Sequence, residues 1–352
     1  MKFRPPRVVL ARCSVCPLIG DLMLKDGRDP HVIADAARVL ASGELVGLPT
    51  ETVYGLGARA DDDAAVAKIF AAKGRPADHP LIVHVSNSEQ AARFAAALPP
   101  LARQLMDAFW PGPLTVIVPR APHMAAAAAG GQNSIGLRCP SHPVARALLA
   151  AAEAVGVAGV AAPSANRFGR VSPTHAAHVV EEFGPSLLVL DGGDCEVGIE
   201  STIVDCSRGH PVLLRPGVLD REQIEAMLGE PLLARDAAAP RASGTLEAHY
   251  APRATVRLLG PEALADALAE ALAKQSLAGL AVYSRSPMIQ MPGLIQRAMP
   301  QDAVAVAHEL FAVLRELDAA GAREIWVESP PPGSAWDGVR DRLTRAAAAF
   351  GG

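Results

Sequence analysis

The sequence predicts an α/β protein whose larger first domain has a twisted mixed sheet and whose second, smaller domain has a parallel sheet. The chain has 352 residues, half of them hydrophobic, which is enough for two domains with cores of their own. Strand signals crowd together at 187–190, 202–205 and 212–214, which favours a mixed sheet over a regular parallel one. From Ala254 onward strand and helix signals alternate, as in a small parallel α/β domain.

The first 30 residues predict an unstructured N-terminal extension, and Met23 is a possible alternative start. Prolines interrupt the segment, and it has no clean apolar stretch with a cleavage site, so it does not resemble a signal peptide. Cys13 and Cys16 form a lone CxxC without a second pair, which is weak evidence for zinc. An odd total of five cysteines at irregular spacing suggests a reducing compartment, so we expect the cytoplasm.

The first domain is expected over 31–217. Apolar residues at helical spacing predict a helix over 31–42, and Gly43 ends it. A short buried strand at 45–48 runs into a loop at 50–57. Aspartates at 61–63 offer N-caps for a helix that ends at Lys73. Further strands are predicted at 81–85, 114–118, 135–138, 159–162, 187–190, 202–205 and 212–214, and further helices at 87–97, 100–109, 142–154 and 173–183.

A long linker is expected over 218–252, after which the composition changes. A short helix reaches Leu228, and an aperiodic stretch containing proline, alanine and arginine follows. The region 253–352 then predicts a Rossmann-like parallel α/β domain. Its predicted strands are 255–259, 279–283 and 323–327, and its predicted helices are 261–274, 302–319 and 337–349.

Charge and hydropathy exclude some classes of protein. The formal net charge is −4, which argues against a constitutive nucleic-acid coat, although a local basic cleft stays open. No apolar run has the length of a membrane span, so no membrane partner is expected.

The sequence has no common phosphate loop: neither GxxxxGK[ST] nor a GxGxxG opening a helix after the first strand occurs. Its candidate site residues lie instead near the ends of predicted strands. Cations and hydroxyls at strand ends suit an oxygen-rich anion, so the residues by themselves predict a phosphate-ester or carboxylate site. The set comprises the loop 50–57, Lys73, Arg75, His79, His84, Ser134, Arg138, Ser164, Asn166, Ser172, Glu200, Ser201, Thr202 and Arg215.

Taken singly, most of these residues also have a purely structural explanation. Lys73 and Arg75 follow a helix, where cations complement the helix dipole. His84 fits a hydrogen-bonded core histidine, and Arg138 fits the surface. Ser172 before Pro173 fits an N-cap.

The motifs themselves resemble the YrdC-like family in order and spacing, over about 31–217. They read PTETVYGLG at 49–57, KGRP at 73–76, PLIVH at 80–84, WPGPLT at 110–115, APSAN at 162–166, ESTIV at 200–204 and LRPG at 214–217. HYAP at 249–252, followed by an α/β segment, resembles the long form of the threonylcarbamoyl-AMP synthase family.

The resemblance implies a reaction in which L-threonine, bicarbonate and ATP give threonylcarbamoyl-AMP and pyrophosphate. It implies Mg²⁺ bound with ATP, without an assigned protein ligand, although Glu200 and Asp191 are possible. It also implies that the product passes to a tRNA threonylcarbamoyl-transferase complex, and direct tRNA contact stays open.

The resemblance also assigns roles to residues of this sequence. Catalytic roles are implied for Lys73, Arg75, Ser164 and Asn166. ATP contacts are implied for Arg75, His79, Ser134, Ser164, Ser172, Arg215 and Tyr250. Threonine contacts are implied for Thr52, His84, Arg138 and Ser201, with Arg138 suited to the carboxylate.

Three other functions compete with this one. A non-catalytic double-stranded RNA or tRNA-binding module of the same fold would need a basic surface. A carbamoyl-transfer domain of hydrogenase maturation proteins would come with acylphosphatase and zinc-finger segments, which the sequence lacks. A purely structural protein would leave the cationic cluster unexplained.

Overall fold

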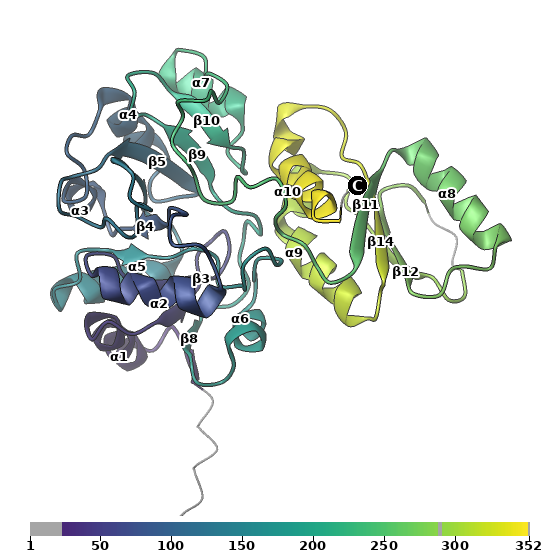
Figure 1. Cartoon of the computed structure of the whole chain (residues 1–352), viewed down its shortest axis with the longest axis horizontal. Helices are drawn as coiled ribbons and strands as arrows, with labels where there is room; N and C mark the ends of the chain where they lie inside the picture. The colour runs from purple at the N-terminus through teal and green to yellow at the C-terminus, as the bar shows by residue number, and fades with distance from the viewer. Residues whose placement is uncertain (1–22, 288–290, 351–352) are drawn as a thin grey trace, which may run out of the picture.

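The computed structural model describes residues 23–287 and 291–350, which form two lobes side by side (Figure 1). The N-terminal lobe holds all elements up to α7, and the C-terminal lobe begins at β11. Among the described residues, no helix is both long and apolar enough to cross a membrane.

The N-terminal lobe is built on one mixed ten-stranded sheet in the order β1-β8-β2-β3-β7-β4-β6-β5-β9-β10. The sheet contains parallel pairs, such as β4 with β6, and antiparallel pairs, such as β9 with β10. The strands are β1 Leu24–Asp26, β2 Val46–Leu48, β3 Gly55–Arg59, β4 Ile82–His84, β5 Leu114–Pro119, β6 Ser134–Arg138, β7 Val160–Ala161, β8 Leu188–Asp191, β9 Thr202–Asp205 and β10 Val212–Arg215. The predicted mixed sheet is confirmed.

Helices flank this sheet, and their caps follow the sequence. Asp62 accepts hydrogen bonds from two backbone amides and begins α2. Gly74, in the left-handed conformation at φ 65°, ends α2. The helices of this lobe are α1 Pro30–Ala41, α2 Asp63–Lys73, α3 Ser88–Ala92, α4 Pro100–Phe109, α5 Pro143–Ala154, α6 Ala176–Phe183 and α7 Arg221–Leu228.

The C-terminal lobe carries a parallel four-stranded sheet in the order β11-β14-β12-β13. This confirms the parallel α/β architecture predicted for the second part of the chain. The elements are β11 Thr255–Leu259, α8 Pro261–Ala273, β12 Leu280–Ser284, β13 Ile295–Ala298, α9 Ala303–Ala319, β14 Glu324–Glu328, η1 Ser334–Trp336 and α10 Asp337–Ala348.

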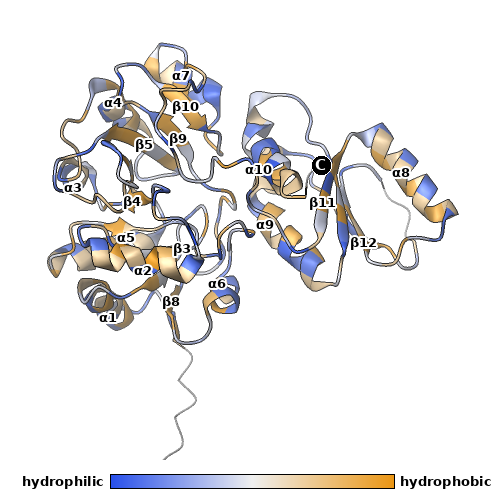
Figure 2. Cartoon of the chain, in the orientation of Figure 1, coloured by the Kyte–Doolittle hydropathy of each residue, from blue (hydrophilic) through white to orange (hydrophobic). Residues whose placement is uncertain are grey.

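A hydrophobic cluster crosses the boundary between the lobes. Val171 and Ile199 of the N-terminal lobe and Tyr250 of the linker share it with Phe311 of α9 and Val339 of α10. Figure 2 shows largely hydrophobic strands in the N-terminal lobe, and helices such as α2 and α8 that carry both hydrophobic and polar residues. The lobes therefore pack against each other through apolar side chains as well as through the linker.

Several sequence-based expectations need correction, and one of them is the helix expected over 87–97, which ends at Ala92. The prediction that residues 1–30 form no folded element is wrong for Leu24–Asp26, which pairs in parallel with β8, whereas residues 1–22, with Cys13 and Cys16, lie outside the described residues. The expected loop at 50–57 ends early, because β3 begins at Gly55. The helix expected from 173 begins at Ala176. The sequence analysis also missed β13, a short strand.

Deleting β1 is expected to lower the melting temperature. A chain that starts at Asp29 keeps the cap of α1 but loses the hydrogen bonds of Met23 and Gly27 to the segment around β8. It also loses the packing of Leu24 on the main core. Each kcal/mol lost shifts the melting temperature of a domain of this size by about 2–4 °C. We expect a drop of this order relative to a chain that starts at Met23, measured calorimetrically. Equal melting temperatures would show that β1 contributes nothing.

Candidate active site

The end of α2 directs Arg75 into a pocket of the N-terminal lobe. Gly74 reverses the chain, and Arg75 donates its backbone amide to the carbonyl of Phe70. The Arg75 side chain is buried and donates to the carbonyl of Pro80 over 2.9 Å. Within the described residues, its Nε has no hydrogen-bond partner. A buried guanidinium with an unused donor is well placed to receive a ligand oxygen.

The parallel strands β4 and β6 bring His84 and Arg138 together at the same edge of the sheet, where they are register partners. On the neighbouring side, Gly55 forms a bridge with Ser164. The carboxyl ends of parallel strands meet at one edge, so these residues converge although they lie far apart in the chain.

Arg215, at the end of β10, is fixed on Ser201. Its guanidinium donates to the carbonyl of Ser201 over 2.9 and 3.1 Å and to the Ser201 hydroxyl over 3.1 Å. Thr115 of β5 lies 2.8 Å from the same hydroxyl. The remaining guanidinium nitrogen of Arg215 donates to the carbonyl of Ser243 in the linker over 2.9 Å.

These side chains surround an enclosed pocket that the linker nearly fills. Its free volume is about 30 Å³, room for roughly two water molecules. Ser243, Gly244, His249 and Tyr250 of the linker close one side. Of the predicted site residues outside the 50–57 loop, the pocket is lined by Arg75, His84, Arg138, Ser164, Glu200, Ser201, Arg215 and Tyr250, and Thr52 lines it from that loop.

Three predicted residues are buried beside this pocket without lining it. The ammonium of Lys73 donates to the carbonyls of Ser164 and Asn166 over 2.6 and 2.5 Å and thereby holds their loop. The Asn166 amide donates to two further carbonyls of the same segment. Ser172 donates to Glu200 over 2.5 Å and is not the N-cap of α6, which is His175.

Two predicted ATP contacts, His79 and Ser134, lie outside this pocket. His79 is partly exposed, with its ring 5.5 Å from that of Phe168. Ser134 lines a separate small cavity of about 10 Å³, together with Gln132 and Ser243. Ser243 and Ile82 also border the closed pocket, so the two cavities adjoin each other at these residues.

Burial sets the charge of the pocket. It lowers the pKa of Arg75 to about 10 and, together with the charge of Arg138, lowers the pKa of His84 to about 3. Burial and Glu200 raise the pKa of Tyr250 to about 12. At neutral pH the arginines are therefore cationic while His84 and Tyr250 are neutral, so the pocket favours an anion.

Arg138 also has a structural partner that the sequence analysis did not single out. Its guanidinium lies 2.8 Å from the carboxylate of Glu51, and both side chains are almost fully buried. The other oxygen of Glu51 accepts the amide of Ser141. Glu51 sits within the 49–57 motif, so its position was visible in the sequence, but its pairing was not.

The two carboxylates considered as possible Mg²⁺ ligands both have partners within the described residues. Both carboxylate oxygens of Glu200 already have partners, Ser172 and Arg342. Asp191 accepts the amide of Gly193. No cluster of three or more His, Cys, Asp or Glu suited to a metal occurs in the described parts of the chain.

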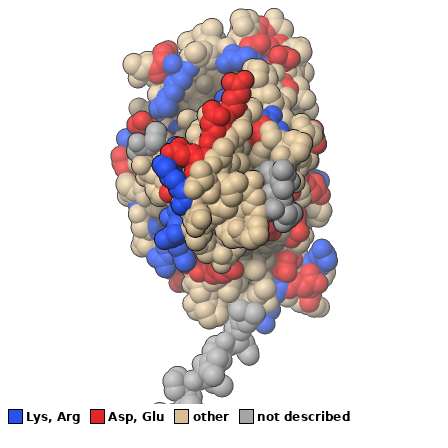
Figure 3. All heavy atoms as spheres, turned by 90° about the vertical axis from the view of Figure 1, so that its right-hand side faces the viewer, with Lys and Arg blue, Asp and Glu red and all other residues tan. Residues whose placement is uncertain are grey.

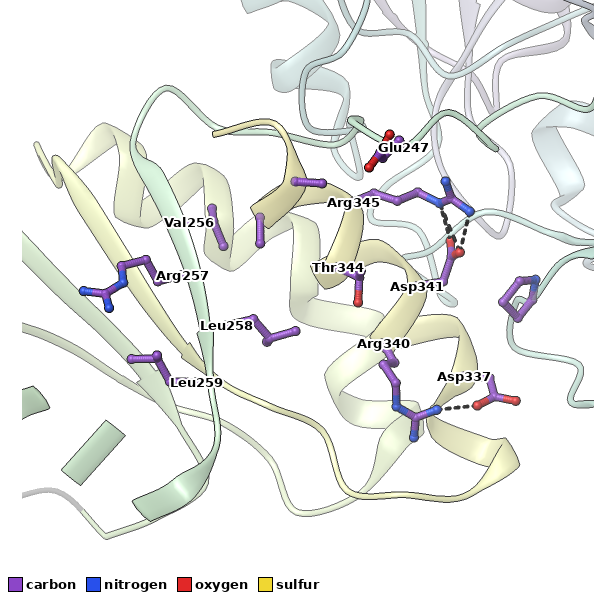
Figure 4. Close-up of a pocket in the computed structure, with 13 residues that line it drawn as sticks. Glu247, Val256, Arg257, Leu258, Leu259, Asp337, Arg340, Asp341, Thr344 and Arg345 are labelled. Atoms are coloured by element: carbon purple, nitrogen blue, oxygen red, sulfur yellow. Dashed lines mark hydrogen bonds and ion pairs between the residues drawn. The ribbon is translucent and has the colours of Figure 1, made fainter. Parts of the chain in front are cut away.

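A second, larger cavity of about 870 Å³ lies between β11, α10 and linker residue Glu247 (Figure 4). Its charged residues on α10 pair with one another, Arg345 with Asp341 and Arg340 with Asp337. The predicted residues all lie elsewhere, so this cavity is not the candidate active site.

A mixed-sheet lobe with a cationic pocket, joined by a linker to a parallel α/β lobe, defines the class of two-domain YrdC-like proteins. The family model of Sua5, YciO and YrdC, described as "Telomere recombination", matches residues 38–217. The model "Threonylcarbamoyl-AMP synthase, C-terminal domain" matches residues 219–348 and so includes the linker. The chain belongs to the long-form threonylcarbamoyl-AMP synthase family.

Relatives of known name cover nearly the whole chain. The threonylcarbamoyl-AMP synthase of Pyrococcus abyssi is 37% identical, over 88% of this chain and 92% of the relative. That of Bacillus subtilis is 37% identical, over 91% of this chain and 93% of the relative. The crystal structure of P. abyssi Sua5 complexed with L-threonine superposes with a TM-score of 0.82 at 34% identity, covering 91% of this chain and 95% of the other.

Proposed function

We propose that this protein is a nucleotidyltransferase that makes threonylcarbamoyl-AMP from L-threonine, bicarbonate and ATP and releases pyrophosphate. The observation that carries the proposal is the enclosed pocket, in which Arg75, Arg138 and Arg215 converge with hydroxyl groups. The threonine carboxylate, a carbamate and a triphosphate all carry negative charge at neutral pH, and these cations and hydroxyls can bind them once the pocket opens. The family to which the chain belongs supports the same reaction.

The chemistry needs positioning more than a side-chain nucleophile. The threonine amine captures bicarbonate as a carbamate, with loss of water. A carbamate oxygen then attacks the α-phosphorus of ATP, and the bond to pyrophosphate breaks. Arg138 would hold the threonine carboxylate, with Thr52, His84 and Ser201 around the substrate. Arg75 and Arg215 would stabilise charge on the phosphates, and Ser164 would contact the nucleotide.

Lys73 and Asn166 are proposed to act at the same site by a different route. Beside the closed pocket, Lys73 donates hydrogen bonds to the carbonyls of Ser164 and Asn166, so it fixes the loop that carries Ser164. Burial and the charge of Arg75 lower the pKa of Lys73 well below its usual range, and an anionic ligand nearby would oppose that shift. His79, Ser134 and Ser172 are proposed to meet ATP outside this closed pocket.

Mg²⁺ is proposed to arrive with ATP, held by phosphate oxygens and water. The product is proposed to pass to a separate tRNA threonylcarbamoyl-transferase complex, and the cytoplasm stays the predicted compartment.

The alternative is an RNA-binding module without catalysis. Figure 3 shows the face of the molecule on the side of the C-terminal lobe, and among the residues that it colours acidic and basic groups are intermixed. That face therefore lacks the continuous basic surface that phosphate-backbone binding requires. The buried arginines of the pocket are enclosed, which suits a small anion better than a nucleic-acid backbone.

Pyrophosphate release tests the proposal directly. The full-length protein with ATP and Mg²⁺ is expected to release pyrophosphate only when threonine and bicarbonate are both present, and mass spectrometry should detect threonylcarbamoyl-AMP. Release that ignores threonine, or RNA binding without any release, would contradict it.

The linker is proposed to act as a lid. A free volume of about 30 Å³ cannot hold ATP, so Ser243 and Gly244 must move before the nucleotide enters. Gly244 has φ 71°, and an added Cβ there would collide with the hydroxyl of Tyr250. A carbamate and a mixed anhydride both hydrolyse in water, so a cover over the loaded site has a chemical purpose.

ATP with threonine is expected to protect residues 235–252 from protease and from amide exchange. Tyr250→Ala is expected to weaken nucleotide binding and to leak intermediate. Because Tyr250 also stacks on Phe311 at a centroid distance of 5.4 Å, Tyr250→Phe is the matched control that keeps the packing. Equal protease sensitivity with and without substrates would leave the segment a tether.

A further inference from the structure

A buried arginine of the C-terminal lobe reaches the pocket side of the N-terminal lobe. The side chain of Arg342, on α10, is fully buried. Its Nε donates to the Glu200 carboxylate over 2.8 Å, and Nη2 donates to the Glu200 carbonyl over 3.2 Å. Its Nη1 donates to the carbonyl of Pro216 over 2.9 Å and to the neighbouring Asp341 over 2.8 Å. The guanidinium also lies over the ring of Tyr250, 5.3 Å from its centroid.

The partners of Arg342 adjoin proposed substrate contacts. Glu200 precedes Ser201, and Pro216 follows Arg215, so Arg342 clamps the backbone beside two site residues that are themselves hydrogen-bonded. The other carboxylate oxygen of Glu200 accepts the hydroxyl of Ser172. The Arg342 guanidinium therefore positions both the Glu200 side chain and the backbone next to Ser201 and Arg215.

The helix that carries Arg342, α10, packs closely against the N-terminal lobe. A Cβ added at Gly338, one turn earlier on α10, would lie 2.8 Å from both the carbonyl oxygen of Gly217 and a methyl carbon of Ile199. This glycine lets α10 approach the 199–217 region closely enough for the Arg342 fork to reach Glu200.

We propose that Arg342 is a positioning residue for the reaction, through which docking of the C-terminal lobe completes the nucleotide side of the pocket. This inference rests on the proposed function. Arg342 neutralises Glu200 and holds it as an acceptor for Ser172, so that a carboxylate can border a site for polyphosphate.

The charge balance explains why an arginine is required. An unpaired carboxylate beside phosphates would repel them, and a buried one is costly in any case. Burial alone raises the pKa of Glu200, but Arg342 and Arg215 outweigh burial and lower it. A lysine could neutralise the charge, but its donors all sit on one nitrogen, whereas the Glu200 carboxylate, the Glu200 carbonyl and the Pro216 carbonyl are held by three different nitrogens of the guanidinium.

ATP affinity of the full-length protein tests the proposal. Outer partners that orient metal-binding side chains typically matter by roughly 10- to 100-fold, and by analogy Arg342→Met should raise the Kd and KM for ATP by about that factor. The effect on threonine should be smaller, since three of its four proposed contacts, Thr52, His84 and Arg138, lie outside the Arg342 contacts and only Ser201 adjoins them. Arg340→Met, on the same helix with contacts only inside its own lobe, is the matched control and should bind ATP normally.

A second variant separates positioning from mere folding. Glu200→Gln placed in the Arg342→Met background removes the unneutralised carboxylate and should restore part of the ATP affinity, a non-additive result. If Arg342→Met does not fold, Arg342→Lys is measured in its place and should bind ATP more weakly than the wild type.

Three results would overturn the role of Arg342. These are wild-type ATP affinity in the Arg342 variant, equal losses for ATP and threonine, or no rescue by Glu200→Gln. ATP binding is read separately from turnover. A wild-type protein that binds ATP yet makes no pyrophosphate therefore contradicts the proposed function while the Arg342 comparison stays valid.

Discussion

Replacing Arg75 or Lys73 by alanine is expected to abolish most pyrophosphate release. Arg75 has a buried, unused donor in the pocket, and Lys73 fixes the loop that carries Ser164. Losing a preorganised contact to developing charge typically costs about 2.7–4 kcal/mol, on the order of a hundredfold or more in rate. Steady-state pyrophosphate release at saturating substrates is the measurement.

Both variants have matched controls at surface residues. Lys68 is on the same helix as Lys73 but pairs with Glu44 at the surface, and Arg93 pairs with Glu153 at the surface. Lys68→Ala and Arg93→Ala should keep normal turnover. Circular dichroism and melting temperature check the fold, which matters most for Lys73→Ala because it leaves two carbonyls without their donor. Near-normal turnover in a folded Arg75→Ala or Lys73→Ala protein would refute the assignment.

The second large effect is expected from Arg138→Met, on stability and on substrate binding together. The variant leaves Glu51 as a buried carboxylate without its cation. Breaking one partner of a buried pair typically costs about 3–5 kcal/mol, which denaturant unfolding can measure. Threonine binding should also be lost, because the proposed partner of the threonine carboxylate is gone.

The double variant Arg138→Met/Glu51→Gln separates these two roles. Removing both charges should recover much of the stability, because no unpaired charge stays buried. Threonine affinity should not return, since glutamine cannot bind a carboxylate as Arg138 would. Recovery of threonine binding in the double variant would show that Arg138 serves the fold alone. Arg59→Met, at a partly exposed pair with Asp61, should cost much less stability.

Local sequence signals were reliable where a short segment decides its own structure. Asp62 as a cap, Gly74 as the end of α2 and the alternation of strands and helices after Ala254 all depend on neighbouring residues. Local signals failed for β1 and β13, because such short strands are stabilised by pairing with distant strands rather than by their own pattern.

Thus the sequence by itself determined the order of elements, the family motifs and most of the polar residues that meet in the pocket. Only the tertiary structure decided which of them meet. Only the structure shows that Lys73 hydrogen-bonds the loop of Ser164, that Glu51 pairs with Arg138, that the linker lines the pocket and that Arg342 pairs with Glu200. Glu200 and Arg342 lie 142 positions apart, and nothing in the charged pattern of α10 distinguishes Arg342 from Arg340 or Arg345. Hydrogen bonds and ion pairs between distant segments form only once the sheet and the docked lobes bring those segments together.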